Sequence, residues 1–185
     1  IADTDKKALR ALYQLSSRDY DFEACYKYLV QIMEDETEKT FENYQALAAL
    51  YFYTNHPEEC ERMFDNLTQY IRTPQDSAIY WGQVLPNHAD IISDYGKHDK
   101  AIQLQEQVLN HFIGKDSLRV SFAYGSLSRY HLLKGNLKEA EHCIQLAKGY
   151  ANDEVKNSLS MAGYMELLQS ILNYAKGKRI NMQEW

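Results

Sequence analysis

The side chains best suited to chemistry in this sequence are six histidines and three cysteines, and their spacing matches no catalytic or metal-binding pattern. Cys25, Cys60 and Cys143 form no C-x-x-C pair and have no histidine at zinc-ligand spacing. Isolated cysteines of this kind are typical of small buried side chains in a reducing compartment, which predicts a cytoplasmic protein. The sequence therefore predicts no metal site and no cofactor.

The histidines and the paired acidic residues also favour structural roles. His88 and His131 fall at core-facing positions of predicted helices, where a hydrogen-bonded histidine is far more common than a catalytic base. Glu58 and Glu59 begin a predicted helix, where negative charge stabilises the helix dipole. The sequence has no H-E-x-x-H, G-x-S-x-G, Walker-type or dinucleotide-binding glycine motif. We therefore expect a protein that is not an enzyme.

Composition narrows the class of protein further. The formal net charge of −6 has the wrong sign for binding a phosphate backbone, so no direct nucleic-acid binding is expected. No apolar run approaches the roughly 18 residues that a membrane-spanning helix needs, so no membrane partner is expected. Glycine and proline number only 8 and 3 among 185 residues, about half their usual share. This scarcity favours long helices.

Two independent markers repeat along the chain with a period near 39 residues. Small residues that follow short polar breaks recur at intervals of 36, 41 and 39 residues: Ala24, Cys60, Ala101 and Ala140. Turn-forming residues within the breaks recur at intervals of 41, 39 and 42 residues: Asn55, Gly96, Gly135 and Gly177. Because both markers keep the same period, the sequence predicts an internal repeat.

Each repeat has the pattern of two amphipathic helices. Apolar residues recur at helical spacing before and after each break, and no segment alternates strictly as a strand would. The fold class is therefore predicted to be all-α. The predicted first helices span residues 8–17, 41–54, 77–95, 118–134 and 155–176. The predicted second helices span residues 22–33, 57–70, 100–112 and 137–150.

Helix ends and one helix interruption follow from particular residues. Glycine in the breaks suits the left-handed position that ends a helix, and Pro57 suits a first helical position. Pro86 should bend the third first helix near Gly82 or divide it into two short helices. The predicted N-caps of the last three first helices are Asp76–Ser77, Asp116–Ser117 and Asn152–Asp153.

On these residues the units resemble tetratricopeptide repeats (TPRs). In that family an aromatic residue, a Leu–Gly or Leu–Ala pair and a second aromatic residue mark the first helix, and a small residue marks the second. The best match is Tyr44, Leu47, Ala48, Tyr51, Cys60 and Phe64. The period exceeds the usual ~34 residues, and in this it is similar to kinesin light chain and to bacterial regulatory TPR domains. The resemblance implies a right-handed α-α superhelix of about four and a half antiparallel helix pairs. The pairs are expected at residues 5–38, 41–73, 77–113, 117–151 and 154–185 of one domain.

The resemblance also implies a concave groove, lined by first helices, that holds a protein or peptide. Carried over by position, it nominates Gln45, Tyr53, Gln83, Asp90, Asp94, Phe122 and Arg129. Only Arg129 matches the family's clamp for C-terminal carboxylates, so a chaperone-tail ligand is not expected. Asp90 and Asp94 favour a neutral or basic partner, unless both are ordinary solvated helix residues.

Two functions remain open on this basis. One is the regulatory or sensor part of a larger bacterial signalling or transcription-regulatory protein, and the alternative is a passive scaffold or assembly subunit. Arg179–Trp185 is too short for a stable closing helix, so we expect the native chain to continue beyond Trp185. An uncovered apolar strip with Leu168 and Ile171 would then favour a homodimer through the C-terminal helices.

Overall fold

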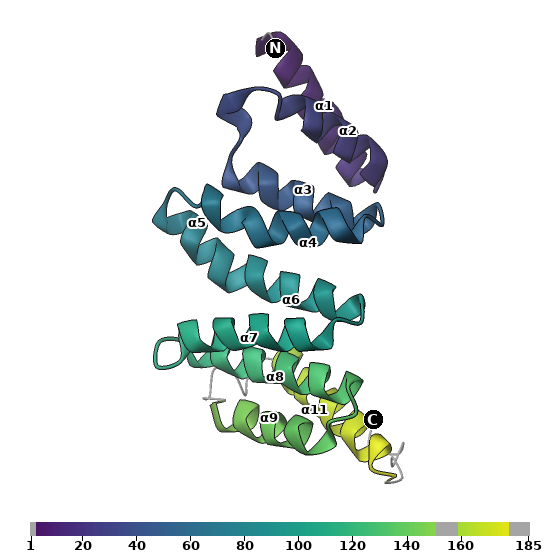
Figure 1. Ribbon diagram of the computed structural model, residues 1–185, viewed down its shortest axis with the longest axis vertical. Coiled ribbons are helices and arrows are strands. Elements are labelled where there is room, and N and C mark those ends of the chain that lie inside the picture. The colour runs from purple at the N-terminus through teal and green to yellow at the C-terminus, as the bar shows by residue number, and fades with distance from the viewer. Residues whose placement is uncertain (1–2, 151–158, 178–185) are drawn as a thin grey trace. The chain divides into compact units, whose positions relative to one another are not determined.

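The computed structural model describes residues 3–150 and 159–177. Every element within these two ranges is helical and none is a strand, which confirms the predicted all-α fold class. The chain falls into two compact units, residues 1–80 and 81–185, and each is described separately. Figure 1 gives the element labels that are used below.

The first unit contains two helix pairs and the start of a third. Helices α1 (Asp3–Arg18) and α2 (Phe22–Ile32) pack together, as do α3 (Phe41–Tyr53) and α4 (Pro57–Asn66), and α2 also packs on α3 (Figure 1). The remaining elements are the short 3₁₀ turns η1 (Glu36–Glu38) and η2 (Leu67–Tyr70) and the helix α5 (Pro74–Ile79).

The second unit continues the same pattern. A π-helical segment, η3 (Tyr80–Val84), leads into α6 (Leu85–Asp94), which packs on α7 (His98–Phe112). Helix α8 (Ser117–Leu133) packs on both α7 and α9 (Leu137–Tyr150). Helix α11 (Leu159–Ala175) lies against α8 and α9 (Figure 1). Consecutive helices thus pair as the repeat predicts.

The two helices of each pair are joined by the same left-handed turn. One residue with positive φ ends each first helix, and a nearly inaccessible small residue follows it by five positions. The four such pairs are Tyr20 and Cys25, Asn55 and Cys60, Gly96 and Ala101, and Gly135 and Ala140. The prediction of Ala24 in the first pair is wrong by one residue. The left-handed residue of this pair is Tyr20, and the five-residue spacing from Tyr20 leads to Cys25.

Backbone hydrogen bonds explain why this turn recurs. At the end of α6, the Gly96 N–H donates to the Ser93 carbonyl at 2.8 Å and the Lys97 N–H donates to the Ile92 carbonyl at 3.1 Å. Equivalent bonds follow α1, α3 and α8. This is the Schellman arrangement, which satisfies carbonyls that a helix end would leave unpaired and requires a left-handed residue.

The small residues that follow the left-handed turns are buried. Cys60, Ala101 and Ala140 are each 0% exposed, which confirms that they are packed inside, and their place at the helix crossing stays a prediction. All three cysteines are buried free thiols, and burial raises the pKa of Cys60 and of Cys143 to about 11. A thiol at that pKa stays protonated and unreactive near neutral pH.

Two of the described helix N-termini have the residues predicted for them, and one has a different N-cap. Pro57 occupies a first-turn position of α4 and Asp116 caps α8, as predicted. The N-cap of α5 is Thr73, not Asp76, which instead takes the third helical position and completes a capping box with Thr73. The predicted cap at Asn152–Asp153 lies outside the described residues.

Helix α11 has one buried face and one exposed apolar face. Leu168 and Leu172 are buried in a core with residues of α9, so the expected exposure of Leu168 is wrong. Leu167, Ile171 and Tyr174, one helical turn apart, are 48%, 44% and 72% exposed. The uncovered strip thus includes Ile171, as predicted. The segment Arg179–Trp185 lies outside the described residues.

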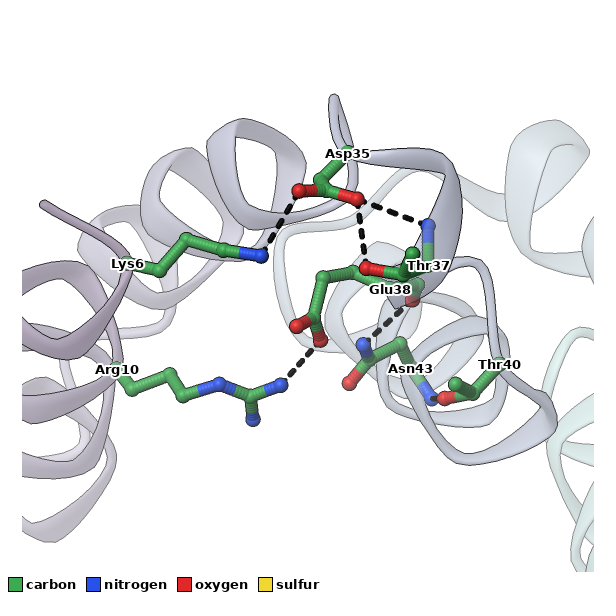
Figure 2. Close-up of polar contacts among 7 residues, drawn as sticks. All are labelled: Lys6, Arg10, Asp35, Thr37, Glu38, Thr40 and Asn43. Atoms are coloured by element: carbon green, nitrogen blue, oxygen red, sulfur yellow. Dashed lines mark hydrogen bonds and ion pairs between the residues drawn. The ribbon is translucent and has the colours of Figure 1, made fainter. Parts of the chain in front are cut away.

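Ion pairs tie α1 to the connection between α2 and α3. The Lys6 ammonium donates to Asp35 at 2.8 Å, and one turn along α1 Arg10 donates to Glu38 (Figure 2). Asp35 also accepts the Thr37 N–H at 2.9 Å, and Asn43 donates to the Glu38 carbonyl at 2.7 Å. The hydrogen bond from Lys6, followed by those from Thr37, holds the pKa of Asp35 well below its usual range.

We expect Asp35→Asn to destabilise the protein in a pH-dependent way. Because the folded state lowers the Asp35 pKa, its carboxylate contributes stability above the unfolded pKa of about 4, and this contribution is lost as the pH falls toward the folded pKa. Urea midpoints of wild type and variant should therefore differ at pH 7 and converge in acid. Asp19→Asn is the matched control, since the Asp19 side chain is 67% exposed. A difference that stays constant with pH would contradict this role.

Candidate ligand-binding site

A pocket of about 480 Å³ lies in the second unit between helices α6, α7 and α8. Helices α6 and α8 are the first helices of successive pairs, and α7 separates them in the chain. Apolar and aromatic side chains dominate the lining, with a few polar groups among them, as in most ligand sites. The lining residues are Trp81, Gly82, Pro86, Asp90, Gln105, Val108, Phe112, Asp116, Leu118, Arg119, Phe122, Ala123 and Ser126.

One wall of the pocket is built around Pro86. Proline has no N–H to donate to the carbonyl four residues earlier, so in a helix the Gly82 carbonyl would remain unpaired. The π-helical segment η3 occurs at this point, and the Arg119 guanidinium of α8 donates to the Gly82 carbonyl at 2.6 Å. The predicted interruption at Pro86 is therefore a π-helical segment that runs directly into α6.

The absence of a side chain at Gly82 leaves room for this contact. A β carbon at Gly82 would lie 2.5 Å from the Arg119 Nη1 atom, well inside van der Waals contact. The guanidinium is fixed further by Asp116, at 3.3 Å from Nε, and by the Phe112 ring, whose centre lies 5.1 Å away. Arg119 therefore connects the start of α8 to η3 and to the end of α7.

Gln105 of α7 lies at the wall of the pocket, and its side-chain oxygen is enclosed by protein. The side chain projects from α7 and is only 2% exposed. No donor among the described residues reaches its Oε1 atom. A buried acceptor without a partner costs about 1–3 kcal/mol, and Ser128 Oγ in the same unit is likewise buried without a partner among the described residues.

Aromatic rings line the opposite part of the pocket. The Trp81 indole stacks on the His111 ring, with ring centres 4.3 Å apart and planes 6° from parallel. Burial, and to a smaller extent Lys115, lowers the pKa of His111, so its ring is neutral near pH 7. Phe122 of α8 adds a second ring that is 40% exposed.

An ion cluster adjoins the pocket through Asp90. Its Oδ1 atom accepts from Arg129 at 2.5 Å and also from the Tyr130 hydroxyl. Arg129 lies 3.8 Å from Asp94 as well. Tyr130 is 0% exposed, and burial together with the negative charge of Asp90 raises the pKa of Tyr130. Asp90 thus has an internal structural role in addition to lining the pocket.

The structure brings together some of the residues predicted from the groove positions. Asp90 and Phe122 line the pocket, and Arg129 and Asp94 join it through the ion cluster. Gln83 is exposed on η3 outside the lining. Gln45 and Tyr53 belong to α3 in the first unit, where Tyr53 stacks on Phe22 with ring centres 4.3 Å apart. A shared site for all seven residues stays a prediction.

Sequence reasoning missed three residues that shape the pocket. Trp81 precedes the first helical turn of α6, Arg119 lies three residues after the N-cap Asp116, and Gln105 lies on a second helix. The groove positions of the family cover a few places on first helices, and they include none of the three. The signal present in the sequence was the Gly82–Pro86 spacing, which marks a carbonyl in need of a donor.

The described residues offer little for other chemistries. Within residues 3–150 and 159–177, no three histidine, cysteine or acidic side chains come together as a metal site. No described helix is long and apolar enough to cross a membrane. The lining of the pocket supplies aromatic rings for stacking, hydrogen-bonding groups and charged side chains.

Comparison with known proteins identifies the fold. No family model matches the sequence, and no curated protein sequence matches it. The structure does match two crystal structures of one chain from Podosopora anserina. Their titles describe nearly identical TPR-like repeats of a kinesin light chain, and one of the two is a single-residue variant. Each is 17% identical to this chain in sequence, and each match covers 97% of this chain. The TM-scores are 0.67 and 0.66, and the matches cover 91% and 92% of the Podosopora chains. The chain therefore has a TPR-like helical repeat fold.

We expect Asp90→Ala to destabilise the protein more than Asp94→Ala. Removing the Asp90 carboxylate leaves the buried Tyr130 hydroxyl without its acceptor, at a cost of about 1–3 kcal/mol. The Asp94 side chain is 54% exposed and its ion pair is long, so its loss should cost less than about 1 kcal/mol. Urea denaturation of both variants measures the difference, and equal losses would show that Tyr130 does not depend on Asp90.

Proposed function

We propose that this chain is a protein-interaction module that binds a peptide segment of a partner through the pocket between α6, α7 and α8. The observation that carries the proposal is a pocket of about 480 Å³ already formed between the first helices of successive pairs. Its stacked aromatic rings and few polar groups suit the side chain of a peptide. The TPR-like fold is consistent with this use.

We further propose a regulatory role, which the choice of helices around the pocket supports. A peptide in the pocket contacts α6 and α8, which belong to different helix pairs, and therefore favours one spacing of those pairs over others. In the regulatory or sensor part of a larger bacterial signalling or transcription-regulatory protein, such a change would be passed along the repeat. The proposal requires that ligand binding raise the melting temperature, since a ligand that binds only the folded state stabilises it.

Selection from a pool of random short peptides tests the proposed function. We expect selected peptides to raise the melting temperature of the wild type. Phe122→Ala should weaken their binding by about tenfold, because a partly buried aromatic contact is lost. Leu133→Ala on the same helix is the matched control, since Leu133 is 55% exposed and lies outside the pocket. A pool that yields no binding peptide, or binding equally sensitive to both variants, would contradict the proposal.

The second candidate function is a scaffold or assembly subunit, and the exposed strip on α11 favours it. Leu167, Ile171 and Tyr174 present apolar surface along one helix face, which suits a homodimer through the C-terminal helices. Sedimentation across a concentration series should then show a dimer that is lost in a Leu167→Glu, Ile171→Glu double variant. A wild type that stays monomeric at all concentrations would rule out the homodimer.

A further inference from the structure

We infer that copies of this chain associate head to tail, with α11 of one copy packed antiparallel on α1 of the next. The inference goes beyond peptide binding and does not involve the pocket. It rests on two exposed apolar helix faces whose residues share an i, i+4, i+7 spacing. The α1 face consists of Ala8, Leu12 and Leu15, and the α11 face consists of Leu167, Ile171 and Tyr174.

The α1 face is exposed at positions that the other first helices bury. Leu12 lies eight residues before the left-handed Tyr20 and is 42% exposed. The residues at the same distance from the other three turns are at most 7% exposed: Leu47, His88 and Leu127. Leu15, five residues before Tyr20, is 47% exposed. Its counterparts are buried or half-buried: Leu50, Ile91 and Tyr130. The repeat therefore normally covers this face of a first helix.

A helix covers the corresponding face of α3. Leu47 and Leu50 share a core with apolar residues along one side of α2, which are Cys25, Leu29 and Met33. Helix α1 meets α2 on a different side, where Tyr13 packs against the same core. The α1 face is thus suited to pack against one more helix that has apolar residues along one side.

The α11 face belongs to such a helix. Antiparallel alignment brings the six residues of the two faces together in three pairs: Leu15 with Leu167, Leu12 with Ile171, and Ala8 with Tyr174. The largest side chain then lies against the smallest, which lets the two helices interdigitate. A symmetric pair of α11 helices would leave the α1 face exposed. Head-to-tail pairing covers both faces of each copy and therefore buries more apolar surface.

Charges beside the two faces agree with this alignment. Arg18 lies one turn beyond Leu15, and its side chain is 74% exposed beside Asp19, at 3.4 Å. The alignment brings Arg18 of one copy near Glu166 of the next, which is exposed and directly precedes Leu167. Among the described residues, Glu166 has no cation at ion-pair distance. The interface would thus place opposite charges together at its edge.

An interface between two different faces does not close at two copies. Each pair retains one free α1 face and one free α11 face, so further copies add until a ring closes or a chain forms. The second candidate function uses the same α11 strip for a symmetric homodimer, which stops at two copies. The size of the assembly therefore distinguishes the two arrangements.

Two variants, each with one altered face, test the inference by mixing. The α1 variant carries Leu12→Glu and Leu15→Glu, and the α11 variant carries Leu167→Glu and Ile171→Glu. All four positions are exposed, so both variants should keep the circular dichroism of the wild type. In sedimentation, the wild type should grow beyond a dimer as its concentration rises, and each variant alone should stay monomeric. An equimolar mixture should form a one-to-one dimer, because each variant supplies the face that the other lacks.

Leu133→Glu is the matched control, because Leu133 is exposed on α8 outside both faces, and this variant should assemble as the wild type does. A wild type that stays monomeric, or a mixture that does, would overturn the inference. An α1 variant that dimerises alone would overturn it in favour of α11 pairing with α11. An α11 variant that dimerises alone would overturn it in favour of α1 pairing with α1.

Charge reversal in the wild-type chain gives a second test that leaves both apolar faces intact. Arg18→Glu and Glu166→Arg should each weaken the association by about threefold, and the double variant should recover the wild-type affinity. Lys138→Glu, at an exposed position of α9, should have no effect. Losses that add in the double variant, or no loss from either change, would overturn the antiparallel pairing. None of these residues lines the pocket, so peptide binding is tested separately.

Discussion

One small, inaccessible side chain at a fixed distance from a left-handed turn is the constraint on which each helix pair depends. In every described pair the small residue follows the left-handed residue by five positions, although the distance between successive turns varies from 35 to 41 residues. The variation falls elsewhere in each repeat, where chain length is not fixed by the crossing. The interval from Asn55 to Gly96 is the longest, and it contains both a 3₁₀ turn and the π-helical segment. A larger side chain at this inaccessible position would overpack the interior, because protein interiors have little spare volume.

The pocket is a consequence of a break in helical regularity within that frame. Pro86 removes a donor from the Gly82 carbonyl, and the absence of a β carbon at Gly82 admits the Arg119 guanidinium that replaces it. A helix of ordinary residues would satisfy its own carbonyl and would need nothing from α8. The interruption therefore joins the end of α7, the start of α8 and η3 around one side chain.

Two arginines organise the electrostatics of the second unit. Arg119 and Arg129 each pair with a carboxylate that also has a second structural role, since Asp116 caps α8 and Asp90 accepts from the buried hydroxyl of Tyr130. These networks hold the polar groups around the pocket in place. For the proposed peptide ligand, such order would reduce the loss of side-chain entropy on binding. The buried Oε1 atom of Gln105 belongs to no such network, since no donor among the described residues reaches it.

The sequence by itself determined the all-α class, the repeat, the helix pairing and the left-handed turns at Gly96 and Gly135, because these depend on local preferences that recur at a fixed period. It also nominated Asp90 and Phe122, which line the pocket. The sequence misplaced the first small buried residue by one position, because the turn there is formed by Tyr20, and a left-handed conformation is unusual for tyrosine. The sequence also misplaced the N-cap of α5, because Asp76 suits both the N-cap and the third helical position. Only the tertiary structure decided that Arg119 donates to Gly82, that Asp90 accepts from Tyr130, and that Gln105 lacks a donor. The first two contacts join residues that are 37 and 40 positions apart, and the third depends on what surrounds a buried atom. Helical periodicity carries no information about such distant contacts or about the surroundings of one atom.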